Sequence, residues 1–184
     1  MLDPAFGHVI VLGIALLFAG AAAQKLRSPA HFAEIFAGYR LLPETAARRL
    51  AWLIPCVELA LAAALALSLA WESSRRLAAV CAGAVLIGYA SGLGVNLLRG
   101  RLDLDCGCGA ARDRRAISAW MVWRNLLLAA ALGIAGLPWS PRACGWTDLL
   151  TVAAGLISCA ILYAAVDRLL GEVAPKALML RSAS

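Results

Sequence analysis

The chain has 184 residues, of which 62% are hydrophobic and 15% are charged, and seventeen Lys and Arg against eleven Asp and Glu give a net charge of +6. A soluble globular domain is typically about 45–50% apolar and about 25% charged, so this composition excludes most soluble classes. The basic excess therefore indicates loops beside a bilayer, and the sequence contains no DNA- or RNA-binding motif. We expect an integral membrane protein with one domain, residues 1–184.

Charged residues divide the chain into five apolar windows, each close to the roughly 20 residues that a helix needs to cross a hydrocarbon core. The predicted spans are residues 4–23, 50–71, 77–98, 116–137 and 149–166. The predicted fold is therefore an all-α, polytopic membrane bundle of five transmembrane helices. We expect the first window to be a retained span, because a signal peptide begins with positive charge and Asp3 precedes this one.

The first loop contains an amphipathic stretch over residues 31–42. Phe32, Ile35, Phe36 and Tyr39 recur there at helical spacing. We expect an interfacial helix that lies on the membrane surface and ends before Pro43.

The loops of a five-span bundle alternate between two faces. We name face B the side that holds the first and third loops, and face A the opposite side. Face B carries thirteen basic residues, whereas face A carries Arg75, Arg76 and Arg142. The positive-inside rule by itself favours a cytoplasmic face B.

The third loop contains the strongest chemical motif, Cys106-Gly107-Cys108-Gly109. The two cysteines are close enough to bridge in a tight turn, and strained, exposed disulfides are the kind that exchange. We favour dithiol–disulfide exchange. Two other interpretations stay open: a soft-metal site, most readily for Cu(I), and a static or incidental pair of thiols. A closed zinc site is disfavoured because the loop offers no further Cys or His as ligands.

Two charged residues lie inside the predicted spans, Glu58 and Arg124. Each follows a face-B arginine by nine residues, so we expect them at similar depth and paired, because charges within a bilayer usually find partners. The pair is interpreted either as purely structural or as auxiliary to the cysteines. In the second case Arg124 would favour a thiolate and Glu58 would exchange a proton.

Cys56 is the third candidate thiol. It lies roughly 10 Å below face B by helical rise, on the side of Cys106 and Cys108. We expect Pro55 to open the second span locally, so that Cys56 borders a vestibule beneath the third loop. A disulfide between Cys81 and Cys144 on face A also stays open.

Several motifs together carry a resemblance that covers nearly the whole chain. They are Lys25-Leu26-Arg27, Tyr39-Arg40-Leu41-Leu42-Pro43, Pro55-Cys56-Val57-Glu58-Leu59, Cys106-Gly107-Cys108-Gly109 and Arg124-Asn125-Leu126-Leu127. In these motifs and in its five-span length the chain resembles the methylamine-utilisation MauE family, which is related to DoxX-like membrane proteins.

The resemblance implies a multi-pass protein of the bacterial inner membrane. Such a protein supports maturation of the disulfide-rich small subunit of methylamine dehydrogenase, together with the thioredoxin-like partner MauD. Cys106 and Cys108 would exchange disulfides with that partner, so we expect face B to be periplasmic, against the charge count. The bundle also resembles quinone-coupled thiol oxidoreductases of the vitamin K epoxide reductase type, which suggests a membrane quinone as cofactor. The alternative is a non-catalytic scaffold or a small-solute or metal carrier, and whether the chain is an enzyme stays open.

Overall fold

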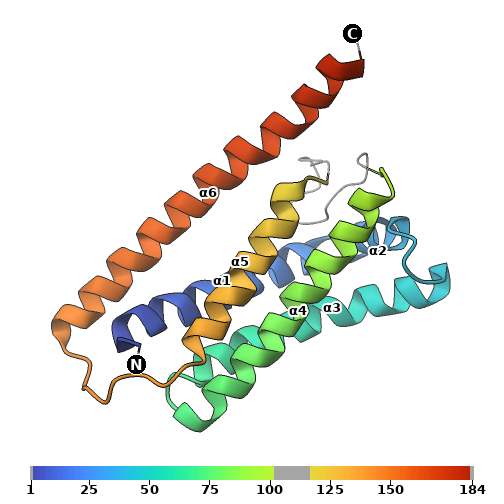
Figure 1. Cartoon of the computed structure of the whole chain (residues 1–184). Helices are drawn as coiled ribbons and strands as arrows, with labels where there is room; N and C mark the ends of the chain where they lie inside the picture. The colour runs from blue at the N-terminus through green and yellow to red at the C-terminus, as the bar shows by residue number, and fades with distance from the viewer. Residues whose placement is uncertain (1, 102–116, 183–184) are drawn as a thin grey trace.

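The computed structural model describes residues 2–101 and 117–182. These residues form six helices: α1 (Pro4–Arg27), α2 (Pro29–Gly38), α3 (Glu44–Leu67), α4 (Glu72–Leu98), α5 (Ala119–Ala135) and α6 (Trp146–Ser182) (Figure 1). The described part contains one isolated β-bridge, between Leu2 and Trp139. The all-α prediction is therefore confirmed.

The bundle is built from two closely packed helix pairs. α1 packs along α3, and α4 packs along α5, while α2 lies on α3 and α6 contacts α1. Figure 1 shows α4 and α5 side by side, and α6 leaning away from them toward its C-terminal end. The shared core contains Val11, Ile14, Phe18, Leu65 and Leu132, together with many alanines that let the helix backbones approach closely.

Within the described residues, four helices are long and apolar enough to cross a membrane: α1, α3, α4 and residues 146–170 of α6. The remaining long segment, α5, is apolar but has 17 residues, and it begins at Ala119 where residue 116 was predicted. Large apolar side chains such as Phe6, Leu77 and Ile161 point outward and are about two-thirds exposed. This pattern suits a bundle whose solvent is lipid.

A helix is present over the predicted amphipathic stretch as α2, which begins two residues upstream of the expected start. Pro29 occupies the first turn of α2, where its missing amide hydrogen costs nothing. The helix ends at Gly38, and Arg40 follows with a positive φ of 48° that turns the chain toward α3. Pro43 then serves as the N-cap of α3, which begins at Glu44, six residues before the predicted start of the second span at residue 50.

The last helix is longer than the predicted span of residues 149–166. α6 has 37 residues, which corresponds to about 55 Å of helix against a hydrocarbon core of about 30 Å. It therefore extends beyond the membrane on the face-B side. Asp167 does not end it, because its carboxylate is paired with Arg124 on α5.

On face A, hydrogen bonds and ion pairs join the residues before α1 to the connection between α5 and α6. We call these contacts the face-A clasp. The backbone N–H of Leu2 donates to the Pro138 carbonyl, and the N–H of Ser140 donates to the Leu2 carbonyl. The guanidinium of Arg142 bridges the carboxylates of Asp3 and Asp148 at 2.9 and 2.7 Å. The start of α1 is thereby tied to the connection between α5 and α6.

Candidate functional site

A buried ion pair joins α1 to α3. The Nζ of Lys25 lies 2.6 and 2.9 Å from the two carboxylate oxygens of Glu58. The side chains are 7% and 1% exposed, so both charges lie almost entirely inside the bundle. Lys25 stands in the last turn of α1, because that helix continues past the predicted end at residue 23 to Arg27. The pair therefore lies toward face B.

Two aromatic side chains complete this cluster. The hydroxyl of Tyr89 on α4 donates to Glu58 Oε1 at 2.8 Å. The ammonium of Lys25 lies 5.3 Å from the centre of the Phe32 ring on α2 and 5.7 Å from that of Tyr89, both within cation–π range. The four residues Lys25, Phe32, Glu58 and Tyr89, which we call the Lys25 cluster, connect four different helices.

The Lys25 cluster is the best candidate for a functional group inside the membrane part. Ionisable side chains within a bilayer are costly and usually mark a site or a specific packing contact. Here the carboxylate of Glu58 accepts hydrogen bonds from an ammonium and from a phenol, so a buried acid, a cation and a hydroxyl meet at one point. The same contacts hold the amphipathic helix α2 against the bundle.

The predicted pairing of Glu58 with Arg124 is wrong. Glu58 binds Lys25, whereas Nη1 of Arg124 lies 2.9 Å from Oδ1 of Asp167 on α6. The depth argument counted residues from Arg115, but α5 begins only at Ala119, so Arg124 lies little more than one turn inside that helix. The extended α6 then brings Asp167 within its reach.

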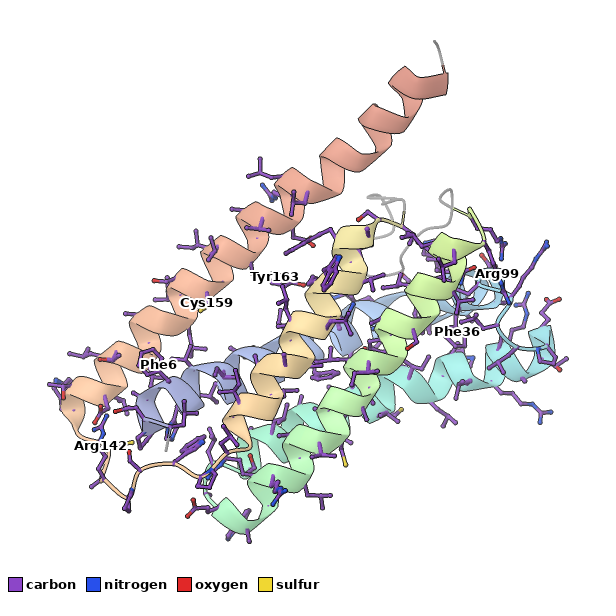
Figure 2. All side chains as sticks on the ribbon, viewed as in Figure 1. Phe6, Phe36, Arg99, Arg142, Cys159 and Tyr163 are labelled. Carbon is purple, nitrogen blue, oxygen red and sulfur yellow. The ribbon has the colours of Figure 1, made fainter. Side chains whose placement is uncertain are left out.

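The Arg124–Asp167 ion pair is the polar tie between α5 and α6. The two side chains are 12% and 19% exposed, and the Arg124 guanidinium also lies 5.8 Å from the centre of the Tyr163 ring. Figure 2 shows Tyr163 on α6, in the part of that helix that lies beside α5. The pair stands at the face-B end, since Asp167 lies twenty-one residues, about 31 Å, beyond the start of α6.

Both cysteines of the third loop, Cys106 and Cys108, lie outside the described residues, but the ends of their loop are described. α4 ends in a Schellman motif, in which Gly100 has a φ of +69° and the N–H of Arg101 donates to the Asn96 carbonyl. The Arg101 guanidinium then donates to the Tyr39 carbonyl and to Oδ1 of Asn96, each at 3.4 Å. The outgoing end is thus fastened to the chain that follows α2.

The returning end of the loop packs on the same place. Ile117 and Met121 form a buried cluster with Tyr39 and Leu93, and Ile35 of α2 packs against it. Nearby, Nη1 of Arg99 donates to the Arg40 carbonyl at 3.4 Å, and Figure 2 shows Arg99 and Phe36 at the same end of the bundle. The described chain therefore ends at Arg101 and resumes at Ile117 at the same end of the bundle, beside α2 on face B.

The four described cysteines are free and exposed: Cys56, Cys81, Cys144 and Cys159. Cys81 and Cys144 are therefore not joined to each other in this structure. Cys56 donates to the Trp52 carbonyl at 3.6 Å, and Trp52 and Leu53 beside it are more than half exposed. Two residues along a helix correspond to a rotation of about 200°, so Cys56 and the buried Glu58 face different ways. They do not share one site, and the redox role of Cys56 stays a prediction.

Sequence reasoning missed Lys25 and Tyr89. Lys25 was counted as a loop charge because it follows the predicted end of the first span, and Tyr89 carried no charge to attract attention. The available signal was the buried carboxylate itself, since an acid within a span needs a cation or donors nearby. The described residues contain no group of three or more His, Cys, Asp or Glu side chains placed to hold a metal ion.

Comparison with known proteins identifies the relatives of this chain. The family described as "Methylamine utilisation protein MauE" matches residues 3–139, from the start of α1 to the end of the α5 region. The chain belongs to the MauE family. Proteins named methylamine utilization protein MauE are 38% identical in Paracoccus denitrificans, over 85% of each chain, and 34% identical in Methylophilus methylotrophus, over 95% of this chain and 90% of the relative. The one from Paracoccus versutus is 38% identical over 82% of this chain and 77% of its own length. No solved structure matches the chain significantly.

The MauE family match includes the third loop and all four members of the Lys25 cluster, because both lie within residues 3–139. Membership in the family places the chain in methylamine utilisation. The long apolar helices agree with a multi-pass membrane protein.

Proposed function

We propose that this MauE protein is a membrane thiol–disulfide exchange partner that supports maturation of the methylamine dehydrogenase small subunit through a thioredoxin-like protein of the MauD type. The observation that carries the proposal is the family match over a segment that contains Cys106-Gly107-Cys108-Gly109. The loop that contains this motif begins and ends beside α2, where a water-soluble partner has access from the membrane surface.

The proposed exchange moves two electrons between two dithiol–disulfide pairs. The Cys106 thiolate attacks one sulfur of the partner's disulfide, forms a mixed disulfide and displaces the partner's other sulfur as a thiolate. The Cys108 thiolate then attacks Cys106 Sγ, and the partner's remaining sulfur leaves as the second thiolate. The partner is thereby reduced and a Cys106–Cys108 disulfide forms. In the opposite direction the same bonds oxidise the partner, and a membrane quinone is the proposed acceptor of the two electrons and two protons.

The structure supports this proposal by how it holds the two ends of the loop. Arg101 is hydrogen-bonded to the chain after α2, and Ile117 is buried against Tyr39. The Lys25 cluster in turn fixes α2 on the bundle through Phe32. Both described ends of the loop are therefore anchored at the same end of the bundle, beside α2.

A mixed-disulfide trap tests the proposal. Membranes from methylamine-grown cells that carry Cys108→Ala are separated on non-reducing gels after acid quenching. We expect a heavier, reducible band that contains both this chain and a thioredoxin-like protein, and its absence from Cys106→Ala cells. Cys81→Ala is the matched control, because it removes an exposed thiol in the face-A half of α4. Failure of both loop variants to trap any partner would overturn the exchange and favour a structural or Cu(I)-binding Cys-x-Cys.

Orientation is part of the same proposal, because a periplasmic partner reaches Cys106 only if face B is periplasmic. A variant in which Cys106 is the single remaining cysteine is treated with a membrane-impermeant maleimide. We expect labelling in intact spheroplasts. Protection until the cells are lysed would place face B in the cytoplasm, as the thirteen basic residues on that face favour.

A further inference from the structure

A groove runs between α4 and α5 on the outer surface of the bundle, starting at face A. Its volume is about 900 Å³, near the upper end of the roughly 300–1,000 Å³ of small-molecule sites. Charged residues, Glu72, Arg75 and Arg76, stand at its face-A end. Small and apolar residues line the rest, among them Ala79, Gly83, Ile87, Ala129, Gly133 and Leu137.

The length of the groove matches one leaflet of a bilayer. Its α4 wall runs from Glu72 to Ile87, sixteen residues whose fifteen helical steps cover about 22 Å. Half of a bilayer with its headgroup region is about 20–22 Å thick. The charged end therefore lies at the membrane surface while the apolar end reaches the middle of the hydrocarbon core.

Glycines on both walls of the groove leave space that larger side chains would occupy. Gly83 is buried in the surface of α4, yet a Cβ added there would meet no atom within 4 Å, and the same holds for Gly133 on the opposite wall. The glycines thus keep the groove open between two helices that pack closely elsewhere.

At the entrance of the groove, Arg75 is held in place by its neighbours and keeps hydrogen-bond donors that no described residue uses. The Arg75 side chain is 8% exposed, and its guanidinium carbon lies 3.8 Å from the centre of the Trp139 ring. Nη2 donates to Glu72 at 2.9 Å, and Glu72 is the one hydrogen-bond acceptor that Arg75 has within the described residues. A guanidinium carries five N–H donors, so several are left for a ligand in the groove. Arg76 is exposed beside it and adds a second positive charge.

We propose that this groove binds one anionic phospholipid of the face-A leaflet. The lipid phosphate is held by Arg75 and Arg76, and an acyl chain lies along the small residues of α4 and α5. An anion is favoured because two arginines outnumber the single Glu72 at the entrance, and a pre-stacked guanidinium loses little rotamer freedom on binding phosphate. Basic pockets between membrane helices recognise lipid headgroups in this way. The site lies at the end of the bundle opposite the cysteine loop, so it does not depend on the proposed exchange.

The test is lipid retention by the purified full-length protein in detergent, measured by native mass spectrometry. Phosphatidylglycerol and phosphatidylcholine with identical acyl chains are titrated in parallel. We expect one phosphatidylglycerol per chain to bind more tightly than phosphatidylcholine. Arg76→Gln should weaken that binding about fivefold, which corresponds to the about 1 kcal/mol contributed by one arginine near an anionic lipid surface. Arg99→Gln, an exposed arginine at the other end of α4, should leave it unchanged.

The groove itself is tested by filling it. Gly83→Leu should abolish tight phosphatidylglycerol binding, whereas Gly88→Leu should preserve it. Gly88 is the matched control because it lies on the same helix, has equal open space and is outside the groove. Equal binding of the two lipids, or no effect of either Arg76→Gln or Gly83→Leu, would overturn the proposal. A dimer that Gly83→Leu disrupts, without phosphatidylglycerol retention, would overturn it in favour of a second copy of the chain in the groove.

Discussion

The ammonium group of Lys25 lies 2.6 Å from the carboxylate of Glu58, and both side chains are buried between α1 and α3. This contact neutralises the one acidic side chain within α3's apolar stretch and joins the last turn of α1 to the middle of α3. With Tyr89 and Phe32 it gathers four helices at a single point near face B.

Removing one partner of the Lys25–Glu58 pair should destabilise the protein strongly. Lys25→Gln and Glu58→Gln each leave an unpaired buried charge, which costs about 3–5 kcal/mol. The double Gln variant should recover most of that loss because no charge is left. Thermal unfolding in detergent measures all three, with Glu44→Gln as control, since Glu44 and Arg48 form an exposed pair worth about 0–1 kcal/mol. Single variants as stable as wild type would contradict the buried pair.

Tyr89→Phe should lower stability while keeping the ring beside Lys25. The variant loses the 2.8 Å hydrogen bond to Glu58, and hydrogen bonds to charged groups contribute about 1.5–3 kcal/mol. A double-mutant cycle with Glu58→Gln isolates this contact. The expected loss is clearly smaller in the Glu58→Gln background, and an equal loss in both backgrounds would show that the hydroxyl acts elsewhere.

Breaking the Arg124–Asp167 pair should loosen α6 from α5. Arg124→Gln or Asp167→Asn removes a contact of 2.9 Å, with an expected cost of about 1–3 kcal/mol. Hydrogen exchange should rise in α6 residues near Asp167 and stay constant in α3. Arg168→Gln, an exposed charge one residue away, is the control. Unchanged protection of α6 in both variants would argue that its contact with α1 alone holds it.

Gly7→Ala should destabilise the face-A end of the bundle. A Cβ at Gly7 would overlap the indole ring of Trp139, on which Arg75 is stacked. Overpacking of this kind costs about 1–3 kcal/mol. Gly20→Ala on the same helix meets no atom within 4 Å, so it should instead stabilise α1 by about 0.5–1 kcal/mol. Thermal midpoints of the two variants should therefore move in opposite directions.

The face-A clasp should weaken in acid. Hydrogen bonds from Arg142 and from the Ala5 amide hold the pKa of Asp3 below its ordinary value of 3.8. A lowered folded-state pKa contributes stability above the unfolded value, and that contribution is lost as pH falls through the folded value. Asp3→Asn should therefore have a lower thermal midpoint than wild type at pH 6, and the difference should shrink below about pH 4. High salt should also reduce it, because the pair is exposed. A difference independent of pH would exclude the ionised Asp3 as its source.

Composition and local pattern were sufficient for the membrane class and the helix order. Apolar windows of the required length predict α1, α3, α4 and α6, and the aromatic spacing from Phe32 to Tyr39 predicts α2. These features are local, because a helix needs only its own apolar length or its own amphipathic period. The Cys106-Gly107-Cys108-Gly109 motif and the family could be recognised from the sequence for the same reason, because both depend on short runs of neighbouring residues.

The partners of the buried charges were decided only by the tertiary structure. Counting residues estimates how deep a side chain lies, but pairing also depends on where each helix ends and how it is rotated, and each residue turns a helix by about 100°. α1 runs four residues past its predicted end and brings Lys25 to Glu58, while α5 starts three residues late and leaves Arg124 for Asp167. The same rotation turns Cys56 outward although it is two residues from Glu58. A shift of one helical turn is invisible in composition, yet it determines which charge lies beside which.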